Sequence, residues 1–174
     1  MLSVAAPAAS VRAKPTLTCR PAQTPAELEA YYAIRRDAFV ATQGLFEGTD
    51  VEPIDDDPRT LHIVATCDPP GDVIGVVRCY PAENGIWYGG RLCVVERYRA
   101  SRLLVGRELV RTAELLMRER GVRVFLGYIQ QRIVHFFEHI DWIRVGEPVT
   151  YAGQPHQLMR PAWGDEPTEI PAAH

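Results

Sequence analysis

The 174-residue sequence lacks features that would place it in several well-defined structural classes. It has no apolar run near the roughly 20 residues that span a bilayer, so no membrane segment is expected. Its formal charge is −3 at pH 7, which argues against nucleic acid as a partner. None of its cysteines are paired at the C-x-x-C spacing of a zinc site, so no metal is expected. We therefore expect a cytoplasmic protein with buried free thiols at Cys19, Cys67, Cys79 and Cys93.

The composition that remains is that of one globular domain. Apolar residues make up 47% of the chain and charged residues 24%, enough to bury a core without disulfides or metals. Residues 1–15 carry their basic side chains after the apolar stretch, the reverse of a signal peptide. We expect a folded domain over residues 16–163, between disordered tails at 1–15 and 164–174.

Hydrophobic periodicity predicts the elements of the first half of the chain. A strand is expected at 16–20. Thr24 is expected to cap a helix that begins at Pro25, with Glu27 completing a capping box. This helix ends near Gly44, and an acidic, turn-rich stretch follows. Three strands joined by short turns predict an antiparallel meander, with strands at 61–66, 73–80 and 86–95.

The second half begins with a change from strand to helix periodicity. Residues 104–117 form an amphipathic helix that stops at Gly121, and an apolar strand follows at 122–129. A strand, a crossover helix and another strand make a right-handed unit with parallel strands. The remaining elements are a helix at 133–139 and strands at 142–150 and 156–159.

The predicted order is therefore β-α-β-β-β-α-β-α-β-β, which gives an α/β (α+β) fold with a mixed, largely antiparallel sheet flanked by helices. Its parallel pair lies in the middle of the sheet. Where two neighbouring strands diverge in such a sheet, a cleft opens that can hold a ligand.

Several segments of the sequence resemble the GNAT acetyltransferase family. They are RRDAFV at 35–40, GRLCV at 90–94, VGRELV at 105–110 and FFEHIDW at 136–142. The resemblance covers about residues 16–160. The motif DDDPRT at 55–60 is similar to a bacterial subgroup described as nitrogen-starvation N-acetyltransferases. The resemblance implies a sheet splayed at its centre and an acetyl-coenzyme A-dependent N-acetyltransferase acting on a small-molecule amine.

The resemblance also implies where coenzyme A binds. The start of the helix near residue 105 offers unpaired N–H groups and a partial positive charge to the diphosphate. Four positions depart from the family pattern. Leu104 stands where a glycine is usual, and Phe137 stands where many members have a tyrosine acid. Ser101 takes the place of an arginine or glutamine, and Gln130 that of an asparagine. The implied cofactor-binding residues are Cys93, Val94, Val95, Arg99, Ser101, Arg102, Val105, Gly106, Arg107 and Gln130.

Transfer of an acyl group to an amine needs a neutral amine and a proton for the departing thiolate. Tyr128 is a candidate donor in place of Phe137, or else a core aromatic residue. Glu52 and Asp55 are candidates for holding a cationic amine, although an acidic run is usually a solvated loop. Two further residues are assigned to the substrate, each with packing or internal pairing as the alternative: Arg91, which lies within an apolar strand, and Trp87.

Two other functions remain open at this point. One is a coenzyme A-binding or partner subunit that has kept the fold and lost turnover, which Leu104 and Phe137 favour. The other is an acyltransferase that makes a lactone signal, because its first helix has a similar Arg-rich pattern. The sequence leaves a homodimer open.

Overall fold

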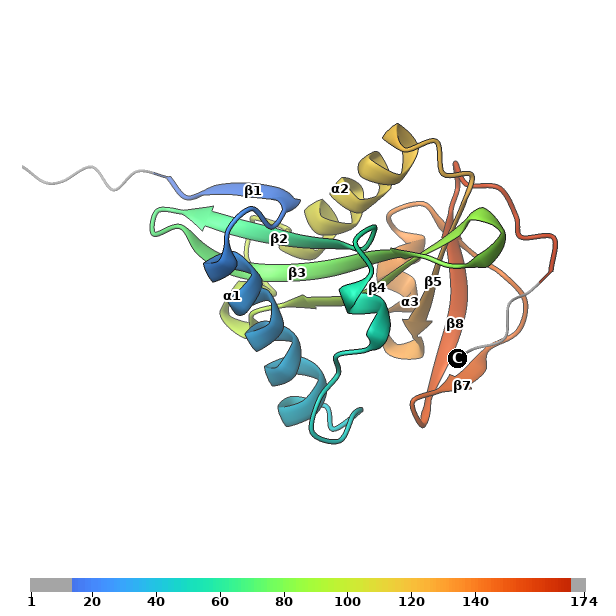
Figure 1. Ribbon diagram of the computed structural model, residues 1–174, viewed down its shortest axis with the longest axis horizontal. Coiled ribbons are helices and arrows are strands. Elements are labelled where there is room, and N and C mark those ends of the chain that lie inside the picture. Colours follow the sequence, from blue (N-terminus) through green and yellow to red (C-terminus); the bar gives the residue numbers. More distant parts are fainter. Residues whose placement is uncertain (1–13, 170–174) are drawn as a thin grey trace, which may run out of the picture.

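Eight strands form one mixed sheet in the computed structural model, which describes residues 14–169 (Figure 1). The strand order across the sheet is β1-β2-β3-β4-β5-β8-β6, and β7 pairs with β8. The fold class predicted from the sequence is confirmed. The strands are β1 (Thr16–Pro21), β2 (Leu61–Asp68), β3 (Asp72–Pro81), β4 (Ile86–Val94), β5 (Val124–Gln130), β6 (Trp142–Arg144), β7 (Val149–Tyr151) and β8 (Gln154–Pro161).

Three α-helices and five helical segments of other types connect these strands in the described part of the chain. None of these helices is long and apolar enough to cross a membrane. The α-helices are α1 (Pro25–Arg35), α2 (Val105–Glu119) and α3 (Val134–Glu138). The other segments are η1 (Arg36–Thr42), a π-helix, and four 3₁₀ turns, η2 (Pro53–Asp56), η3 (Glu83–Gly85), η4 (Glu96–Tyr98) and η5 (Gln131–Ile133).

Most of the tail predicted at 1–15 and the last part of that predicted at 164–174 lie outside the described residues. The start of the second tail is described, and it is attached to the domain. The Asp165 backbone N–H donates to the carbonyl of Arg123 at 2.8 Å, and the Asp165 carboxylate pairs with the same arginine at 2.8 Å. Gly164 is buried. The contacts of the domain therefore extend past residue 163.

The first helix begins as its capping residues predict. The Thr24 hydroxyl accepts a hydrogen bond from the Glu27 N–H at 3.2 Å. The Glu27 carboxylate accepts from the Gln23 N–H and pairs with Arg20 instead of completing a reciprocal box. The helix continues into η1, and Gly44 lies just beyond it at φ +60°, a conformation that suits glycine.

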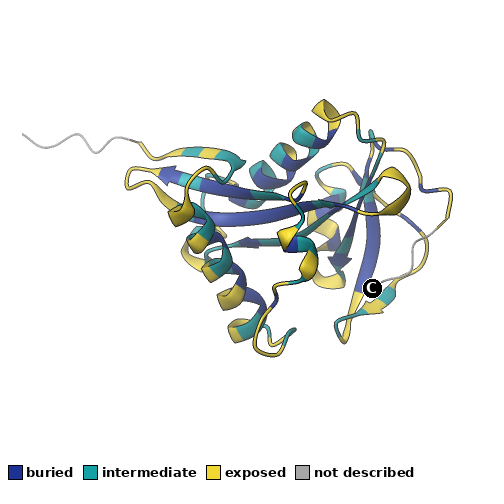
Figure 2. Ribbon diagram, in the orientation of Figure 1, coloured by how far each residue is buried: buried dark blue, intermediate teal, exposed yellow. Residues whose placement is uncertain are grey.

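Helices cover both faces of the sheet (Figure 1). Successive strand residues point to opposite faces, so Val64 belongs to the core cluster under α1 and η1, while Ile63 belongs to the cluster that contains the buried face of α2. The buried positions lie along the inner strands and on the sheet-facing sides of the helices (Figure 2). Cys67, Cys79 and Cys93 are buried and Cys19 is half-buried, all as free thiols.

The strands β4 and β5 are parallel neighbours joined by α2, as predicted, but they pair over only four residues each. The register runs from Ile86 opposite Val124 to Gly89 opposite Gly127. Beyond Gly89, β4 continues beside β3, and beyond Gly127, β5 continues beside β8. We call this divergence the fork. It is the splay that the family resemblance implies.

The single strand predicted at 142–150 is wrong in one respect, because it is two strands. The strands β6 and β7 pair with opposite ends of β8. Gly146, at φ +61°, and Pro148 lie between them and interrupt the ladder. The buried Gln157 amide donates to the carbonyls of Val145 and Gly146 at 3.1 Å each, which satisfies the backbone at the interruption.

We expect Gly75 to fix how closely α2 packs on the sheet. A Cβ at this position would lie 3.0 Å from side-chain atoms of both Leu109 and Val105. Gly75→Ala should therefore lower the free energy of unfolding by about 1–3 kcal/mol, measured by urea denaturation. The control is Gly90→Ala, where the nearest atom is 4.0 Å away on Tyr80. Equal stability of both variants would contradict the tight packing.

Candidate functional site

A cavity of about 1150 Å³ passes through the fork. Both of its edges belong to the diverging strands, with Gly90 to Val94 on one side and Tyr128 to Gln130 on the other. Its walls come from both faces of the sheet: Phe46 and Glu52 lie on the α1 side, and Gly106 and Phe136 on the α2 side. The sheet is therefore open from one face to the other at its centre.

The amino-terminal end of α2 faces this cavity, with Val105, Gly106 and Arg107 among the lining residues. The first α2 residue whose N–H reaches back to an upstream carbonyl is Glu108, which donates to Leu104, and no side chain caps this end. The N–H groups of the first turn are thus available to an anion.

Leu104 adopts the left-handed conformation at the cap position, with φ +52° and ψ +41°. This conformation costs a residue with a side chain about 1–2 kcal/mol and glycine very little, which explains why glycine is usual there. The Leu104 side chain is 46% exposed. It lines the cavity but is not buried against the start of the helix.

Two of the predicted phosphate-binding arginines line the cavity and one does not. Arg99 and Arg107 lie on its wall, whereas Arg102 is exposed outside it. The Arg99 Nε donates to the Val94 carbonyl at 3.0 Å. Arg107 pairs with the neighbouring Glu108 at 3.2 Å. Each guanidinium group has further N–H donors beyond these contacts.

The predicted backbone site at the end of β4 is only partly free. Cys93 and Val94 line the cavity, but the Val95 N–H donates to the Ile74 carbonyl at 2.9 Å. Val95 therefore continues the pairing with β3. The Cys93 side chain lies in the core under α1, and burial raises the pKa of its thiol to about 12. That thiol is uncharged at neutral pH and is a weak nucleophile.

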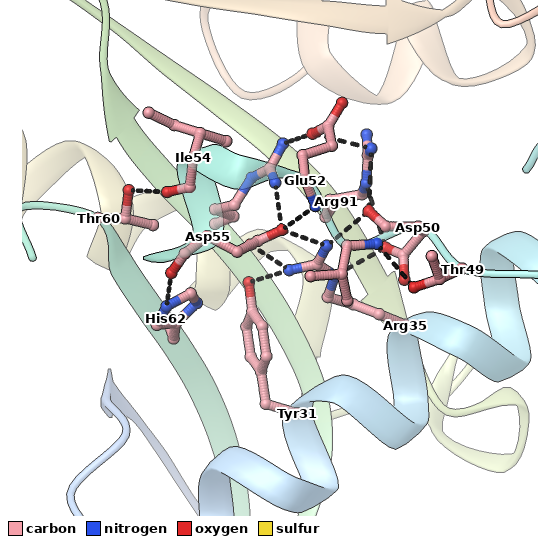
Figure 3. A network of polar contacts seen from close by, with 12 residues as sticks. Tyr31, Arg35, Thr49, Asp50, Glu52, Ile54, Asp55, Thr60, His62 and Arg91 are labelled. Atoms are coloured by element: carbon pink, nitrogen blue, oxygen red, sulfur yellow. Dashed lines mark hydrogen bonds and ion pairs between the residues drawn. The ribbon is translucent and has the colours of Figure 1, made fainter. Parts of the chain in front are cut away.

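On the α1 side of the fork lies a buried cluster of six charged residues, which we call the ion cluster (Figure 3). It contains three arginines and three acids, so its formal charge is zero. Arg35 bonds Asp50 at 2.7 Å and Asp55 at 2.6 Å, and Arg78 bonds Asp55 at 2.9 Å and Glu52 at 2.6 Å. The sixth member, Arg91, bonds Asp50 at 3.2 Å and Glu52 at 3.1 Å.

Asp55 is the central acid of this cluster, and its side chain is fully buried. Burial alone would raise its pKa, but hydrogen bonds from Arg35 and the Glu52 N–H, with the charge of Arg78, hold the pKa well below its usual value. Asp55 does not line the cavity. The structure therefore gives it a structural place rather than contact with a substrate.

Glu52 is the acid that the cluster presents to the cavity. Its side chain is 36% exposed, and its carboxylate is held by Arg78 and Arg91. Arg91 lies in a β-bulge at φ +55°, where Arg91 and Leu92 stand opposite the single residue Val77. A bulge re-aims a side chain, and here the guanidinium lies 4.3 Å from the centre of the Phe46 ring.

A row of stacked tyrosines forms another wall of the cavity, with Tyr80, Tyr88, Tyr128 and Tyr151 from four strands. Neighbouring ring centres are 5.7–6.0 Å apart. Desolvation raises the pKa of Tyr128, so its phenol stays protonated at neutral pH and can donate a proton. His156, at the end of the row, has a pKa lowered mainly by burial.

The structure brings ten of the fifteen predicted site residues to one cavity and leaves five outside it. Trp87 lines a separate small hollow with Leu61 and Val122, away from the fork. The Ser101 hydroxyl is buried and has no hydrogen-bond partner in the described chain. The ten are Glu52, Arg91, Cys93, Val94, Arg99, Val105, Gly106, Arg107, Tyr128 and Gln130; the five are Asp55, Trp87, Val95, Ser101 and Arg102.

Sequence reasoning missed several residues of the site. Arg78 is an arginine within an apolar strand, as Arg91 is, but the sequence analysis singled out only Arg91. Gln43 bonds Gln130 at 2.9 Å across the cavity. No sequence pattern pointed to Tyr80 or Tyr151, because only the pairing of the strands brings them to the same wall.

The model of the acetyltransferase (GNAT) family matches residues 28–142, about two thirds of the chain. The chain belongs to the GNAT family. No curated protein matches the sequence.

Solved structures share this GNAT fold at low sequence identity. An acyl-CoA N-acyltransferase from Pseudomonas aeruginosa has a TM-score of 0.71 at 22% identity, covering 86% of this chain and 100% of that one. ElaA from Escherichia coli has a TM-score of 0.70 at 18% identity, covering 84% and 98%. The CoA-dependent acyl-homoserine lactone synthase BjaI, solved with SAM and isopentyl-CoA, has a TM-score of 0.62 at 18% identity, covering 76% and 74%.

We expect Asp55→Asn to lower the free energy of unfolding at pH 7 by roughly 3–5 kcal/mol, because Arg35 and Arg78 lose the charge that compensates them. The pKa of Asp55 is depressed in the folded state. Its contribution to stability is therefore present above the unfolded pKa near 4 and is lost as the pH falls through lower values. Denaturation curves between pH 7 and pH 3 measure this.

The control for Asp55→Asn is Asp72→Asn, which removes the exposed Asp72–Arg97 ion pair. An exposed pair contributes little, so this variant should remain as stable as the wild type. A stability gap between wild type and Asp55→Asn that stays constant down to pH 3 would contradict the assignment.

Proposed function

We propose that this chain is a coenzyme A-dependent N-acyltransferase, which moves an acyl group from a thioester to the amine of a small molecule. The observation that carries the proposal is the cavity through the fork. It joins an uncapped helix end on one face of the sheet to a carboxylate and a row of phenols on the other. A thioester and an amine can thus meet inside the sheet, each from its own face.

The donor side suits coenzyme A. The N–H groups of Val105 and Gly106 and the positive end of α2 would bind the diphosphate, with Arg99 and Arg107 adding charge. The pantetheine arm would lie along the end of β4 at Val94, which lines the same cavity. This arrangement brings the thioester to the fork.

The acceptor side supplies the groups that aminolysis needs. The amine nitrogen attacks the thioester carbonyl carbon, the C–N bond forms, the C–S bond breaks, and the amine loses a proton while the thiolate gains one. Glu52 would hold the amine and accept its proton, directly or through water. Tyr128 would donate to the departing sulfur, because Phe137 has no hydroxyl. Arg91 fixes the position of Glu52 and is within reach of an anionic group on the acceptor.

Several finer points are part of the proposal and rest on the sequence. The family resemblance implies acetyl-coenzyme A as the donor. Membership of the nitrogen-starvation subgroup and a place in the bacterial cytoplasm are predictions from resemblance and composition. The alternative is a coenzyme A-binding subunit without turnover, which Phe137 favours.

Titration calorimetry with coenzyme A and acetyl-coenzyme A, followed by thiol release with a panel of amines, tests the proposal. We expect both ligands to bind and at least one amine to release free thiol. If neither coenzyme A nor acetyl-coenzyme A bound, the proposal would be refuted. Binding without thiol release on every amine would favour the subunit without turnover.

We expect Arg99→Glu to lower the affinity for coenzyme A by roughly tenfold or more, since a charge-assisted contact to phosphate is replaced by repulsion. The matched control is Arg97→Glu in the same loop, because Arg97 is exposed and does not line the cavity. Its affinity should stay within about twofold of the wild type, and both variants should melt near the wild-type temperature. Unchanged affinity in Arg99→Glu would remove the arginine from the diphosphate site.

A further inference from the structure

Much of the hydrogen-bonding capacity of the ion cluster is used within the cluster itself. Arg35 donates from all three of its guanidinium nitrogens to other residues of the chain. Asp55 accepts at both carboxylate oxygens, from arginines and from the Glu52 N–H. Neither Arg35 nor Asp55 lines the cavity, so their role is to hold the cluster together.

Two members of the cluster keep capacity for a ligand at the cavity wall. Glu52 contacts both of its arginines through the single oxygen Oε2. Its side chain is still 36% exposed, and a carboxylate can accept further hydrogen bonds. Arg91 uses Nε and Nη2 for its contacts, and its Nη1 has no partner among the residues that the structure describes. The Glu52 carboxylate and the Arg91 guanidinium lie side by side at one edge of the cluster (Figure 3).

Arg91 is the arginine that the cluster presents to the cavity. Arg78 also lines the cavity, and its Nε has no hydrogen-bond partner in the described chain, but this nitrogen is buried. The Phe46 ring covers one face of the Arg91 guanidinium, which leaves the edge of the group for a planar anion such as a carboxylate. The Arg91 side chain is only 7% exposed, so such a contact would be poorly screened by water.

The charge of this wall limits what it can bind. The cluster contains as many arginines as acids, and Glu52 already shares its negative charge between two arginines. An acceptor with an ammonium group alone would bring a positive charge to a wall with no negative charge in excess. An acceptor with a carboxylate alone would bring an unmatched negative charge. A molecule that carries both groups adds no net charge, and each group meets its opposite.

We propose that the acceptor is an α-amino acid, with its amino group at Glu52 and its carboxylate at Arg91. The inference rests on the proposed function, since it takes Glu52 as the group that holds the amine. The two side chains contact each other at 3.1 Å, so their ligand-binding edges are neighbours, as are the amino group and carboxylate on one α-carbon. Transfer forms one amide bond and breaks one C–S bond. The amine loses a proton and the thiolate gains one, and the product is an N-acyl amino acid.

The surroundings of this pair favour an apolar or aromatic side chain on the amino acid. Phe46 lies against one arginine of the cluster and Tyr80 against another, with each guanidinium 4.3–4.6 Å from the ring centre. Pro53 and Ile54 follow the acid of the pair directly in the chain. All four residues line the cavity. Apolar and aromatic walls with a few placed polar groups are typical of sites for small molecules.

Acceptors that differ only in the carboxylate test the inference. Thiol release from acetyl-coenzyme A is measured with L-phenylalanine and L-leucine, and with phenethylamine and isopentylamine, which are the same molecules without the carboxylate. We expect kcat/KM to be at least about tenfold higher for each amino acid than for its partner amine, because the amine lacks the charge-assisted contact to Arg91. Equal or higher kcat/KM for the amines would overturn the inference and leave the proposed function intact.

L-Phenylalaninamide separates the carboxylate from the ionisation of the amine. An α-amino group without a free carboxylate beside it has a pKa near 8, so more of the amide is in the reactive neutral form at pH 7. The amide should nevertheless react more slowly than L-phenylalanine, and a faster amide would overturn the inference. Calorimetry with L-phenylalanine in the presence of coenzyme A adds a readout without turnover. If coenzyme A binds but neither amino acid binds or releases thiol, the inference fails. If neither coenzyme A nor acetyl-coenzyme A binds, the proposed function itself fails.

A variant of the arginine locates the carboxylate. Arg91→Lys keeps the charge and loses the planar edge. It should raise KM for L-phenylalanine by about tenfold or more and leave KM for phenethylamine within about twofold. Arg35→Lys is the matched control, because it weakens the same cluster at a residue that does not line the cavity. It should lower the melting temperature and keep the wild-type ratio of kcat/KM between the two acceptors.

The comparison of the two variants distinguishes recognition from support of the fold. An equal loss of the preference for L-phenylalanine in Arg35→Lys and Arg91→Lys would remove Arg91 from the carboxylate site. A preference that Arg91→Lys keeps in full would do the same. If Arg91→Lys does not fold, the acceptor series with the wild-type protein decides the inference by itself.

Discussion

The short pairing of β4 with β5 is the constraint on which the site depends. Hydrogen bonding between them stops at Gly89 and Gly127, and each strand then follows its other neighbour. Continued pairing would close the middle of the sheet and remove the cavity. The crossover helix α2 leaves from the end of β4 and returns to β5, so its amino-terminal end lies beside the opening. The same pair of strands, β4 and β5, therefore sets both the opening of the sheet and the position of the helix beside it.

The ion cluster fixes the wall of the cavity on the α1 side, where the acceptor is proposed to bind. Between η1 and β2, the only regular structure is the short turn η2. Arg35 and Arg78 hold them through Asp50 and Asp55, with almost no exposure to solvent. Buried charges are stable only when they are paired, so the segment has little freedom to move without breaking the cluster. Glu52, the least buried of the three acids in the cluster, is thereby kept at the cavity wall.

Much of the fold followed from patterns that reside in single segments. The cap at Thr24 and the helix stop at Gly121 are short-range features, and the structure contains both. The interruption between β6 and β7 was missed, because apolar residues on either side of Gly146 read as one strand. The end of the site where we propose that the diphosphate binds is also local, since one loop and one helix supply it.

The opposite wall of the cavity, where we propose that the acceptor binds, could be predicted only in part, because it is assembled by tertiary pairing. Asp55 was expected to face a substrate, but its partners are arginines 20 and 23 residues away along the chain. An isolated acidic run does not show which of its members is buried. Trp87 was also expected at the substrate but lies away from the fork. The sequence alone does not show which face of β4 each residue occupies, because this depends on the register with β3 and β5.

The opening of the sheet to both faces also bears on the order of events in catalysis. Under the proposed function, the thioester and the amine approach through separate entrances, so neither reactant obstructs the other. The Cys93 thiol is buried and has a raised pKa, so it is poorly suited to carry the acyl group from the thioester to the amine. Transfer is then direct within a ternary complex, and the two products can depart in either sequence.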